Sequence, residues 1–355
     1  MKITKGQRLP YDVFDEDGKL LLLRGSPIAS HHQVLRIREH GYHHLGRPRS
    51  TSAFASMSQL ADRLNIIFQD VTGNHPHGIL KKRIISLARD FVEISDSDPD
   101  AAFAYPHLNI HHSYLVVHSM MAAIVSSRLA LAKGMDSDQR TSIVCAALTH
   151  DFGIIPIADR INSSDRLQKE DFELVHAHVA EGLNMLHHYG VDDPLWLDAI
   201  AYHHEFLDGS GYTEKKGDEI PLAGRILSLA DSYSAMLRPR PYRDRIIARL
   251  ALETLYATEL HRYDGFLIET LIWDFGFYPP GSLLRLVNRE MAVSIRNTPG
   301  ILDSPQVAML TDAQGRPLAT PAVRDTNDPA FAIVSTLDPS MAARAGRLIE
   351  KCWQI

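Results

Sequence analysis

Apolar residues recur at intervals of three and four positions along most of the chain between residues 53 and 275. This spacing gathers apolar side chains on one face of an α-helix, so each such stretch predicts a helix. Ser113 is a favourable N-cap for one of these helices, and Gly134 is a favourable stop for it. The predicted helices lie near residues 54–71, 79–94, 113–133, 137–151, 168–189, 193–204, 220–237, 241–259 and 264–275.

Both ends of the chain instead show short apolar runs separated by turn residues. Near the N-terminus, the turn at 15–18 lies between the apolar runs 11–14 and 20–23, which predicts a β-hairpin. After residue 297, a turn at 312–315 predicts a second hairpin, followed by a strand near 331–334 and a last helix over 341–352. The prolines at 279–280 predict the start of a further short helix.

The pattern therefore predicts a mainly α fold with small β-containing flanks. We expect four units: a small β-rich N-terminal unit (1–48), a helical connecting segment (49–111), a catalytic helical domain (112–296), and a C-terminal β-hairpin with a helix packed on the core (297–355).

Composition excludes several classes of protein. The chain has 355 residues, of which 45% are hydrophobic and 23% charged, as in ordinary soluble domains. Its formal net charge of -6, without a basic run, argues against duplex nucleic acid as a partner. The most apolar stretch, 114–132, is interrupted by His118 and several serines, which predicts an amphipathic soluble helix and no membrane span. Two cysteines and no apolar leader lead us to expect a cytoplasmic protein.

Histidine is unusually frequent, with 19 in the chain. Most single histidines are solvated or hydrogen-bonded side chains, so position decides which of them carry chemistry. Asp231 lies within an apolar helix, where a carboxylate is costly to bury unless it is paired or bound to a metal ion. The other candidates end or line predicted helices, one group to each helix: His118, the pair His150 and Asp151, His178, and the pair His203 and His204. This ordered series of imidazoles and carboxylates predicts a metal site.

The same residues resemble the motifs of the HD-GYP family, a branch of the HD hydrolase superfamily. The HD element is matched at 150–153, and the HHExxDGxGYP string at 203–212. The ADxxDA and RPYR strings are matched at 230–235 and 240–243, and the HPxxG element by His178 and Gly182. The resemblance covers roughly residues 112–290 and does not reach the first hundred residues. It implies an HD-type helical bundle at the core of the fold.

The resemblance also implies an activity, the hydrolysis of cyclic di-GMP to pGpG and onward to GMP by two divalent metal ions. Fe or Mn is favoured and Zn is an alternative. Asp151 would bridge the ions and, with His150, form the catalytic centre. A second copy of the chain or another signalling protein is a candidate partner. The implied metal ligands are His118, His150, Asp151, His178, His203, His204 and Asp231, and the implied substrate-binding residues are Arg240, Tyr242, Arg243 and Tyr212.

Four positions depart from the family pattern. Ile154 replaces a lysine that is expected to contact a substrate phosphate, and Tyr114 stands where members with three metal ions carry a glutamate. We therefore expect two ions. Thr213 replaces the proline of GYP, and Ser234 replaces the second aspartate of ADxxDA.

The missing lysine keeps a second hypothesis open, a weakly active or inactive protein that acts as a cyclic di-GMP receptor or interaction module. A hydrolase acting on another nucleotide would share the same metal site. A purely structural helical protein would leave the ordered series of ligands unexplained.

Overall fold

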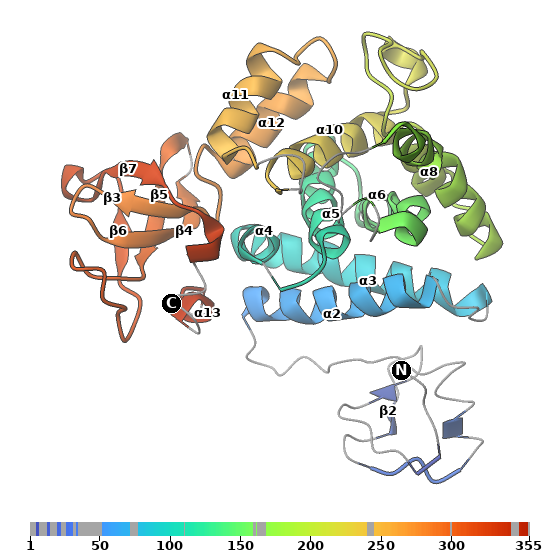
Figure 1. The fold of residues 1–355 in the computed structure, drawn as a ribbon, viewed down its shortest axis with the longest axis horizontal. Helices are drawn as coiled ribbons and strands as arrows, with labels where there is room; N and C mark the ends of the chain where they lie inside the picture. Colours follow the sequence, from blue (N-terminus) through green and yellow to red (C-terminus); the bar gives the residue numbers. More distant parts are fainter. Residues whose placement is uncertain are drawn as a thin grey trace.

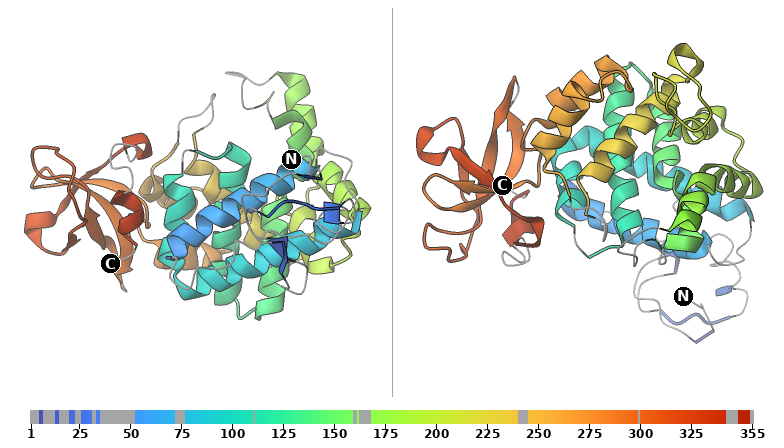
Figure 2. Two further views of the ribbon diagram at one scale, coloured as in Figure 1. Left: turned by 90° about the horizontal axis from the view of Figure 1, so that it is seen from below. Right: turned by 45° about the horizontal axis from the view of Figure 1, so that its top comes forward.

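A helical body forms most of the molecule, with a small sheet at one end of it (Figures 1 and 2). The structure is a computed structural model. It describes residues 5–6, 13–14, 20–22, 26–30, 33–34, 52–71, 77–109, 111–158, 161, 168–239, 245–298, 300–341 and 348–353. In the N-terminal part, β1 (Val13–Phe14) pairs antiparallel with β2 (Leu20–Leu22), which confirms the predicted hairpin.

The helical body follows the apolar periodicity closely, and the mainly α fold is confirmed. The 3₁₀ turns η1 (Phe152–Ile157) and η2 (Gly217–Glu219) lie in two of the connections. The helices are α2 (Ala53–Val71), α3 (His77–Ser97), α4 (Pro99–Leu108), α5 (Tyr114–Ala132), α6 (Ser137–Thr149), α8 (Lys169–His188), α9 (Pro194–Ala201), α10 (Leu222–Met236), α11 (Ala248–Ala257) and α12 (Gly265–Phe275). Of these, α4 was not predicted from the sequence.

Helix α5 runs through the middle of the body and packs against α4, α6 and α10. Ser113 caps its first turn by accepting a hydrogen bond from the amide of Val116, as predicted. The expected amphipathic character is wrong, because the helix is buried on all sides rather than along one stripe. It is long and apolar enough to cross a membrane by composition alone, but 83% of its apolar window is buried inside the protein, as in a core helix.

The C-terminal sheet begins earlier than the sequence pattern predicts. The segment after Pro280 forms a strand where a short helix was expected, so that prediction is wrong. A turn closes at 312–315 as predicted, but the segment beyond it pairs only through a single bridge, Thr311 with Pro317. Five antiparallel strands lie in the order β6 (Val323–Asp325), β5 (Ile301–Met309), β4 (Met291–Thr298), β3 (Leu283–Leu286) and β7 (Ile333–Thr336).

A bidentate ion pair attaches this sheet to the helical body. Arg296 on β4 donates from Nη1 to Oδ1 of Asp98 at 2.6 Å and from Nη2 to Oδ2 at 2.9 Å. Asp98 is also the N-cap of α4 and accepts from the amide of Ala101. The same carboxylate therefore begins a helix and holds the sheet beside it. The remaining elements are the turn η3 (Pro329–Phe331) and the last helix α13 (Leu348–Lys351). Helix α13 lies within the helix predicted over 341–352, of which residues 342–347 lie outside the described residues.

Two segments cross at very short range where η1 meets α8. A Cβ placed on Gly153 would lie 2.1 Å from the carbonyl oxygen of His178. Because this contact is with backbone, no side-chain rotation can relieve it. Glycine at 153 therefore allows the residues that follow α6 to lie directly against α8.

We expect Gly153→Ala to lower the free energy of unfolding by at least about 1–3 kcal/mol, the usual cost of overpacking a filled interior. Gly265→Ala is the matched control, because a Cβ there would meet only Leu260 Cδ1 at 3.7 Å, an ordinary contact. Urea denaturation monitored by circular dichroism measures both. Equal stability of the two variants would contradict the close crossing.

Candidate metal centre

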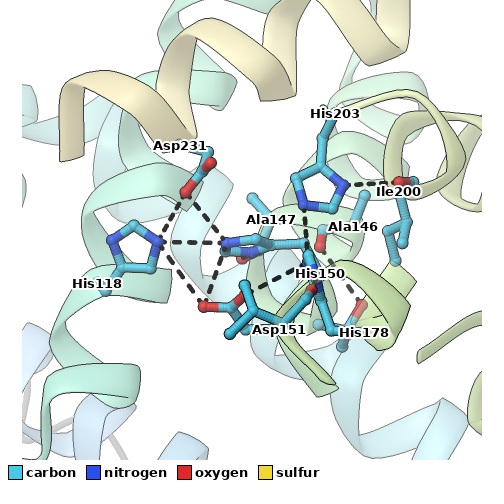
Figure 3. Close-up of polar contacts among 11 residues, drawn as sticks. His118, Ala146, Ala147, His150, Asp151, His178, Ile200, His203 and Asp231 are labelled. Atoms are coloured by element: carbon cyan, nitrogen blue, oxygen red, sulfur yellow. Dashed lines mark hydrogen bonds and ion pairs between the residues drawn. The ribbon is translucent and has the colours of Figure 1, made fainter. Parts of the chain in front are cut away.

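Five helical segments each deliver one part of a single polar cluster inside the apolar body (Figure 3). His118 comes from α5, and Asp231 from α10. His150 and Asp151 lie between α6 and η1, where the chain changes from α-helix to 3₁₀ turn. The remaining residues are His178 on α8 and the neighbours His203 and His204 just after α9. All seven predicted ligands therefore meet, although they span more than a hundred positions of sequence.

The first cluster consists of His118, His150 and Asp151, whose ligand atoms all lie within 4.8 Å of one another. The Nε2 atoms of the two histidines are 3.3 Å apart. Asp231 adjoins this cluster, with its Oδ1 atom 2.8 Å from Nε2 of His118 and 3.6 Å from Nε2 of His150. Two imidazoles and two carboxylates thus converge on one small volume, which is a donor set suited to a divalent cation.

The second cluster consists of His178, His203 and His204, with ligand atoms again within 4.8 Å of one another. The Nε2 atoms of His178 and His203 are 3.3 Å apart. The ring of His204 lies 4.1 Å from that of His203 and 5.0 Å from that of His178, measured between centroids. This cluster offers three nitrogen ligands and no carboxylate of its own.

Asp151, a member of the first cluster, also faces the second cluster. Its Oδ2 atom is 3.7 Å from Nε2 of His150 and 3.9 Å from Nε2 of His118. Its other oxygen, Oδ1, is 3.9 Å from Nε2 of His178. The two oxygens of one carboxylate therefore face different sets of imidazoles, which is the arrangement that a bridge between two cations requires.

Backbone carbonyls orient three of the rings. Nδ1 of His150 donates to the carbonyl oxygen of Ala147 at 2.8 Å, and Nδ1 of His203 donates to that of Ile200 at 2.6 Å. Nδ1 of His178 makes the equivalent bond to the carbonyl of Val175, also three residues earlier. A proton held on Nδ1 leaves the Nε2 lone pair available, and such bonds are usual for histidines that bind metal ions.

The two clusters differ in charge. Burial opposes a charged ring at His150, but Asp151 and Asp231 outweigh it and raise its pKa to about 9. Burial, together with the neighbouring histidines, holds the pKa of His203 well below its ordinary value. Burial likewise lowers the pKa of His204 to about 4. The metal-free first cluster therefore holds a proton at neutral pH, while His203 and His204 are neutral.

The same histidines keep both carboxylates ionised. Burial disfavours the charged form of Asp231, but hydrogen bonds with His118 and His150 dominate and hold its pKa well below the ordinary value. At Asp151, burial is again outweighed by His150, His118 and His178, and the pKa is lowered. Both aspartates are thus available as anionic ligands.

Aromatic side chains line two sides of the cluster. Tyr212 lies over His204 with ring centroids 4.7 Å apart, and His176 stacks on Tyr212 at 3.9 Å with an interplanar angle of 25°. On another side, Tyr114 stacks on His118 at 5.3 Å. The sequence analysis missed His176, because it lies two positions from His178 and no spacing rule links it to Tyr212.

Glu205 follows the two histidines but has a structural task. Its Oε1 atom accepts a hydrogen bond from the amide of Thr213 at 2.9 Å, and a Cβ on Gly211 would lie 2.6 Å from Oε2. The buried carboxylate thereby fastens the loop that carries Tyr212. Thr213, where the family has proline, supplies an amide that proline lacks.

The structure describes two further departures from the family pattern, but it does not describe three of the predicted substrate-binding residues. Ile154 is half-buried and packs against the apolar core, so it brings no cation to the site. Ser234 is fully buried on α10. Arg240, Tyr242 and Arg243, predicted to bind substrate, lie outside the described residues.

Comparison with known proteins identifies the helical body. Residues 102–267 match the HD domain family. A solved structure of an HDG"Y"P protein from Bdellovibrio bacteriovorus aligns with a TM-score of 0.54 at 15% identity, covering 76% of this chain and 95% of that one. This likeness establishes the fold.

Sequence relatives agree with that family. A cyclic di-GMP phosphodiesterase of Pseudomonas aeruginosa is 29% identical over 237 residues, covering 64% of this chain and 56% of the relative. A cyclic di-GMP phosphodiesterase of Thermotoga maritima is 34% identical over 175 residues, covering 46% of this chain and 47% of the relative. The 3'3'-cGAMP-specific phosphodiesterase 2 of Vibrio cholerae is 30% identical over 162 residues, covering 44% and 31%. The chain spans less than two thirds of the length of each of these relatives. The predicted resemblance to the HD-GYP family is confirmed.

The position of Asp151 predicts that its loss weakens both metal positions. We expect Asp151→Ala to reduce affinity for both ions, and His178→Ala to reduce affinity mainly for one, each by more than about tenfold. Titration of metal-free protein with Mn²⁺, with stoichiometry checked by elemental analysis, measures this. His187→Ala is the control, since His187 is exposed on the same helix as His178. Loss of only one ion from Asp151→Ala would contradict the bridging position.

The charge difference predicts that metal binding releases protons. An ion entering the first cluster must displace the proton on His150, whose pKa is raised to about 9. Affinity there should fall as pH drops through and below that value, whereas His203 and His204 have no proton to displace at neutral pH. Calorimetry near pH 7 in buffers of different ionisation enthalpy should show about one proton released. Heats that do not depend on the buffer would refute the assignment.

Proposed function

We propose that this chain is a metal-dependent phosphodiesterase that hydrolyses cyclic di-GMP to pGpG, and onward to GMP, at a dinuclear His/Asp centre. The observation that carries the proposal is the carboxylate of Asp151, whose two oxygens face two separate groups of imidazoles. The relatives that share this domain are phosphodiesterases of cyclic dinucleotides by name. A site that holds two cations suits the displacement at phosphorus that such a reaction requires.

The donor set fits two divalent ions. His118, His150 and Asp231 would hold one, His178, His203 and His204 the other, and Asp151 both. The ligand atoms are nitrogen and oxygen without thiolate, which suits iron or manganese and also admits zinc. When bound, the ions would activate water and offset the negative charge that develops at the phosphate. The carbonyls of Ala147, Val175 and Ile200 keep the histidine rings oriented for this task.

Two ions, rather than three, agree with the residue at position 114. Tyr114 stacks against His118, where family members with three ions carry a glutamate. A phenol with an ordinary pKa of about 10 is neutral at physiological pH and is a poor bridging ligand. Tyr114 thus closes this side of the centre with an aromatic ring.

Substrate binding is assigned to Tyr212 and to the arginine-rich segment that follows α10. Tyr212 stacks between His176 and His204, and the exposed ring of His176 forms the end of this stack that reaches solvent. A purine base can extend such a stack. Arg240, Tyr242 and Arg243, by resemblance, would contact the phosphates and guanine bases.

One observation favours a second function, that of a receptor. Ile154 packs against the apolar core and offers no donor to a phosphate. Loss of one preorganised donor at a reacting oxygen commonly costs about 10²–10³ in turnover. A protein with that defect could bind cyclic di-GMP through the intact metal centre and cleave it slowly.

An anaerobic assay with cyclic di-GMP and Fe²⁺ or Mn²⁺ tests the proposal. We expect the wild type to form linear pGpG and Asp151→Ala to form none, because the bridging ligand is lost. The His187→Ala variant should retain activity. Products are separated by chromatography, and 3'3'-cGAMP is assayed alongside. Binding without product in the wild type would establish the receptor function instead.

We expect Tyr212→Ala to raise the KM for cyclic di-GMP by about 5- to 100-fold, the range that loss of one base–aromatic stack commonly produces, because it removes the ring that supports His176 at the end of the stack. Tyr212→Phe retains the ring and should change KM less than about threefold. Steady-state kinetics compare the two variants. Equal effects of alanine and phenylalanine would show that stacking is not the role of this side chain.

A further inference from the structure

Two arginines and a histidine lie close together beside the metal centre without having been assigned a role. His107 is near the end of α4, Arg238 follows the end of α10, and Arg245 precedes α11. We call these three residues the basic cluster. Both arginines are electrostatic neighbours of His107, and Arg245 is also a neighbour of Arg238.

The hydrogen bonds of the basic cluster go to backbone carbonyls. Arg238 donates from Nη1 to the carbonyl of Asn109 at 2.9 Å, and Arg245 donates from Nη2 to that of Leu337 at 3.0 Å. The ring of His107 donates from Nδ1 to the carbonyl of Pro280 at 3.1 Å. These contacts hold the three side chains in place but supply no negative charge to the arginines.

Arg238 is the least satisfied of the three. Its Nε atom is buried and has no hydrogen-bond partner. Within the described ranges of the chain no carboxylate forms an ion pair with it, whereas Arg245 has Asp338 at 3.8 Å. A largely desolvated guanidinium without a counter-charge is unfavourable, and an anion supplied by a ligand would offset that cost.

Burial lowers the pKa of Arg238 and is opposed by Tyr114, so the tyrosine is its electrostatic neighbour. Burial, followed by the two arginines, lowers the pKa of His107 to about 4, so that ring is neutral. The fixed positive charge of the cluster therefore belongs to the arginines.

The position of Arg238 connects the basic cluster with the metal centre. Tyr114, its neighbour, stacks on His118 of the first cluster. Arg238 also lies two residues beyond the end of α10, the helix that carries Asp231.

We propose that Arg238 binds the second phosphate of a cyclic dinucleotide, the one that is not held at the metal centre. The inference rests on the proposed function, because it takes the scissile phosphate to lie at the His/Asp clusters. A planar guanidinium with a free Nε–H offers paired donors for phosphate oxygens. Arg238 would then select substrates that carry two phosphates at a fixed separation.

Two substrates separate this role from a structural one. Cyclic di-GMP has two phosphates, and bis(p-nitrophenyl) phosphate is a phosphodiester with one. We expect Arg238→Met to raise both the KM and the Kd for cyclic di-GMP by about tenfold or more, as for loss of a charged hydrogen bond. The KM for bis(p-nitrophenyl) phosphate should stay within about twofold, with bound metal and Tm unchanged. Arg238→Lys should lie between Arg238→Met and the wild type.

Arg249→Met is the matched control, since Arg249 is a surface arginine on α11 that pairs with Glu253 at 2.8 Å. It should leave both substrates unaffected. An unchanged Kd and KM for cyclic di-GMP in Arg238→Met would overturn the inference. So would an equal effect on both substrates or a loss of bound metal, because Arg238 would then act by supporting the fold.

The direct binding measurement distinguishes failure of this inference from failure of the proposed function. If the wild type binds cyclic di-GMP without cleaving it, hydrolysis is refuted and the Kd of Arg238→Met still decides the role of Arg238. If the wild type cleaves cyclic di-GMP and Arg238→Met matches it, the inference alone fails. If the wild type does not bind cyclic di-GMP, both fail.

Discussion

The structure depends on the burial of two carboxylates, Asp151 and Asp231, inside an otherwise apolar helical body. Each is costly to bury alone, and histidines from other helices offset that cost. Because the partners come from α5, the end of α6 and α8, the carboxylates constrain how these helices pack. The apolar core supplies most of the driving force for folding, while the polar cluster specifies one arrangement of the helices.

The sequence predicted most of the helices because their apolar stripes follow the helical period. It missed α4, in which every residue from Ala101 to Leu108 is buried, so no alternation with polar residues marks one face. It also mistook the strand β3 for a helix, because the preceding prolines are compatible with either element. Where burial is complete, local pattern carries little information, and neighbouring segments decide the structure.

The candidate metal centre could be anticipated because each predicted ligand stands out in its own helix, as Asp231 does among apolar residues. The residues around it could not. His176 becomes part of the site only when the loop carrying Tyr212 folds over α8, and Arg238 only when α10 ends beside Asn109. Such contacts join segments far apart in the chain, and no spacing in the sequence encodes them.

The bonds from histidine Nδ1 to Ala147 and Ile200 have a consequence for how the helices end. Both carbonyls belong to the last turns of α6 and α9, where backbone oxygens lack the regular amide partner within the helix, and that of Ile200 also accepts a long bond from the amide of His203 at 3.5 Å. The imidazoles therefore act as C-terminal caps, and the site lies where the negative ends of two helix dipoles meet. Those dipoles favour cations. Fraying of either final turn would release a cap and displace a predicted ligand in the same event, so helix termination and the retention of a bound metal ion would be coupled at this centre.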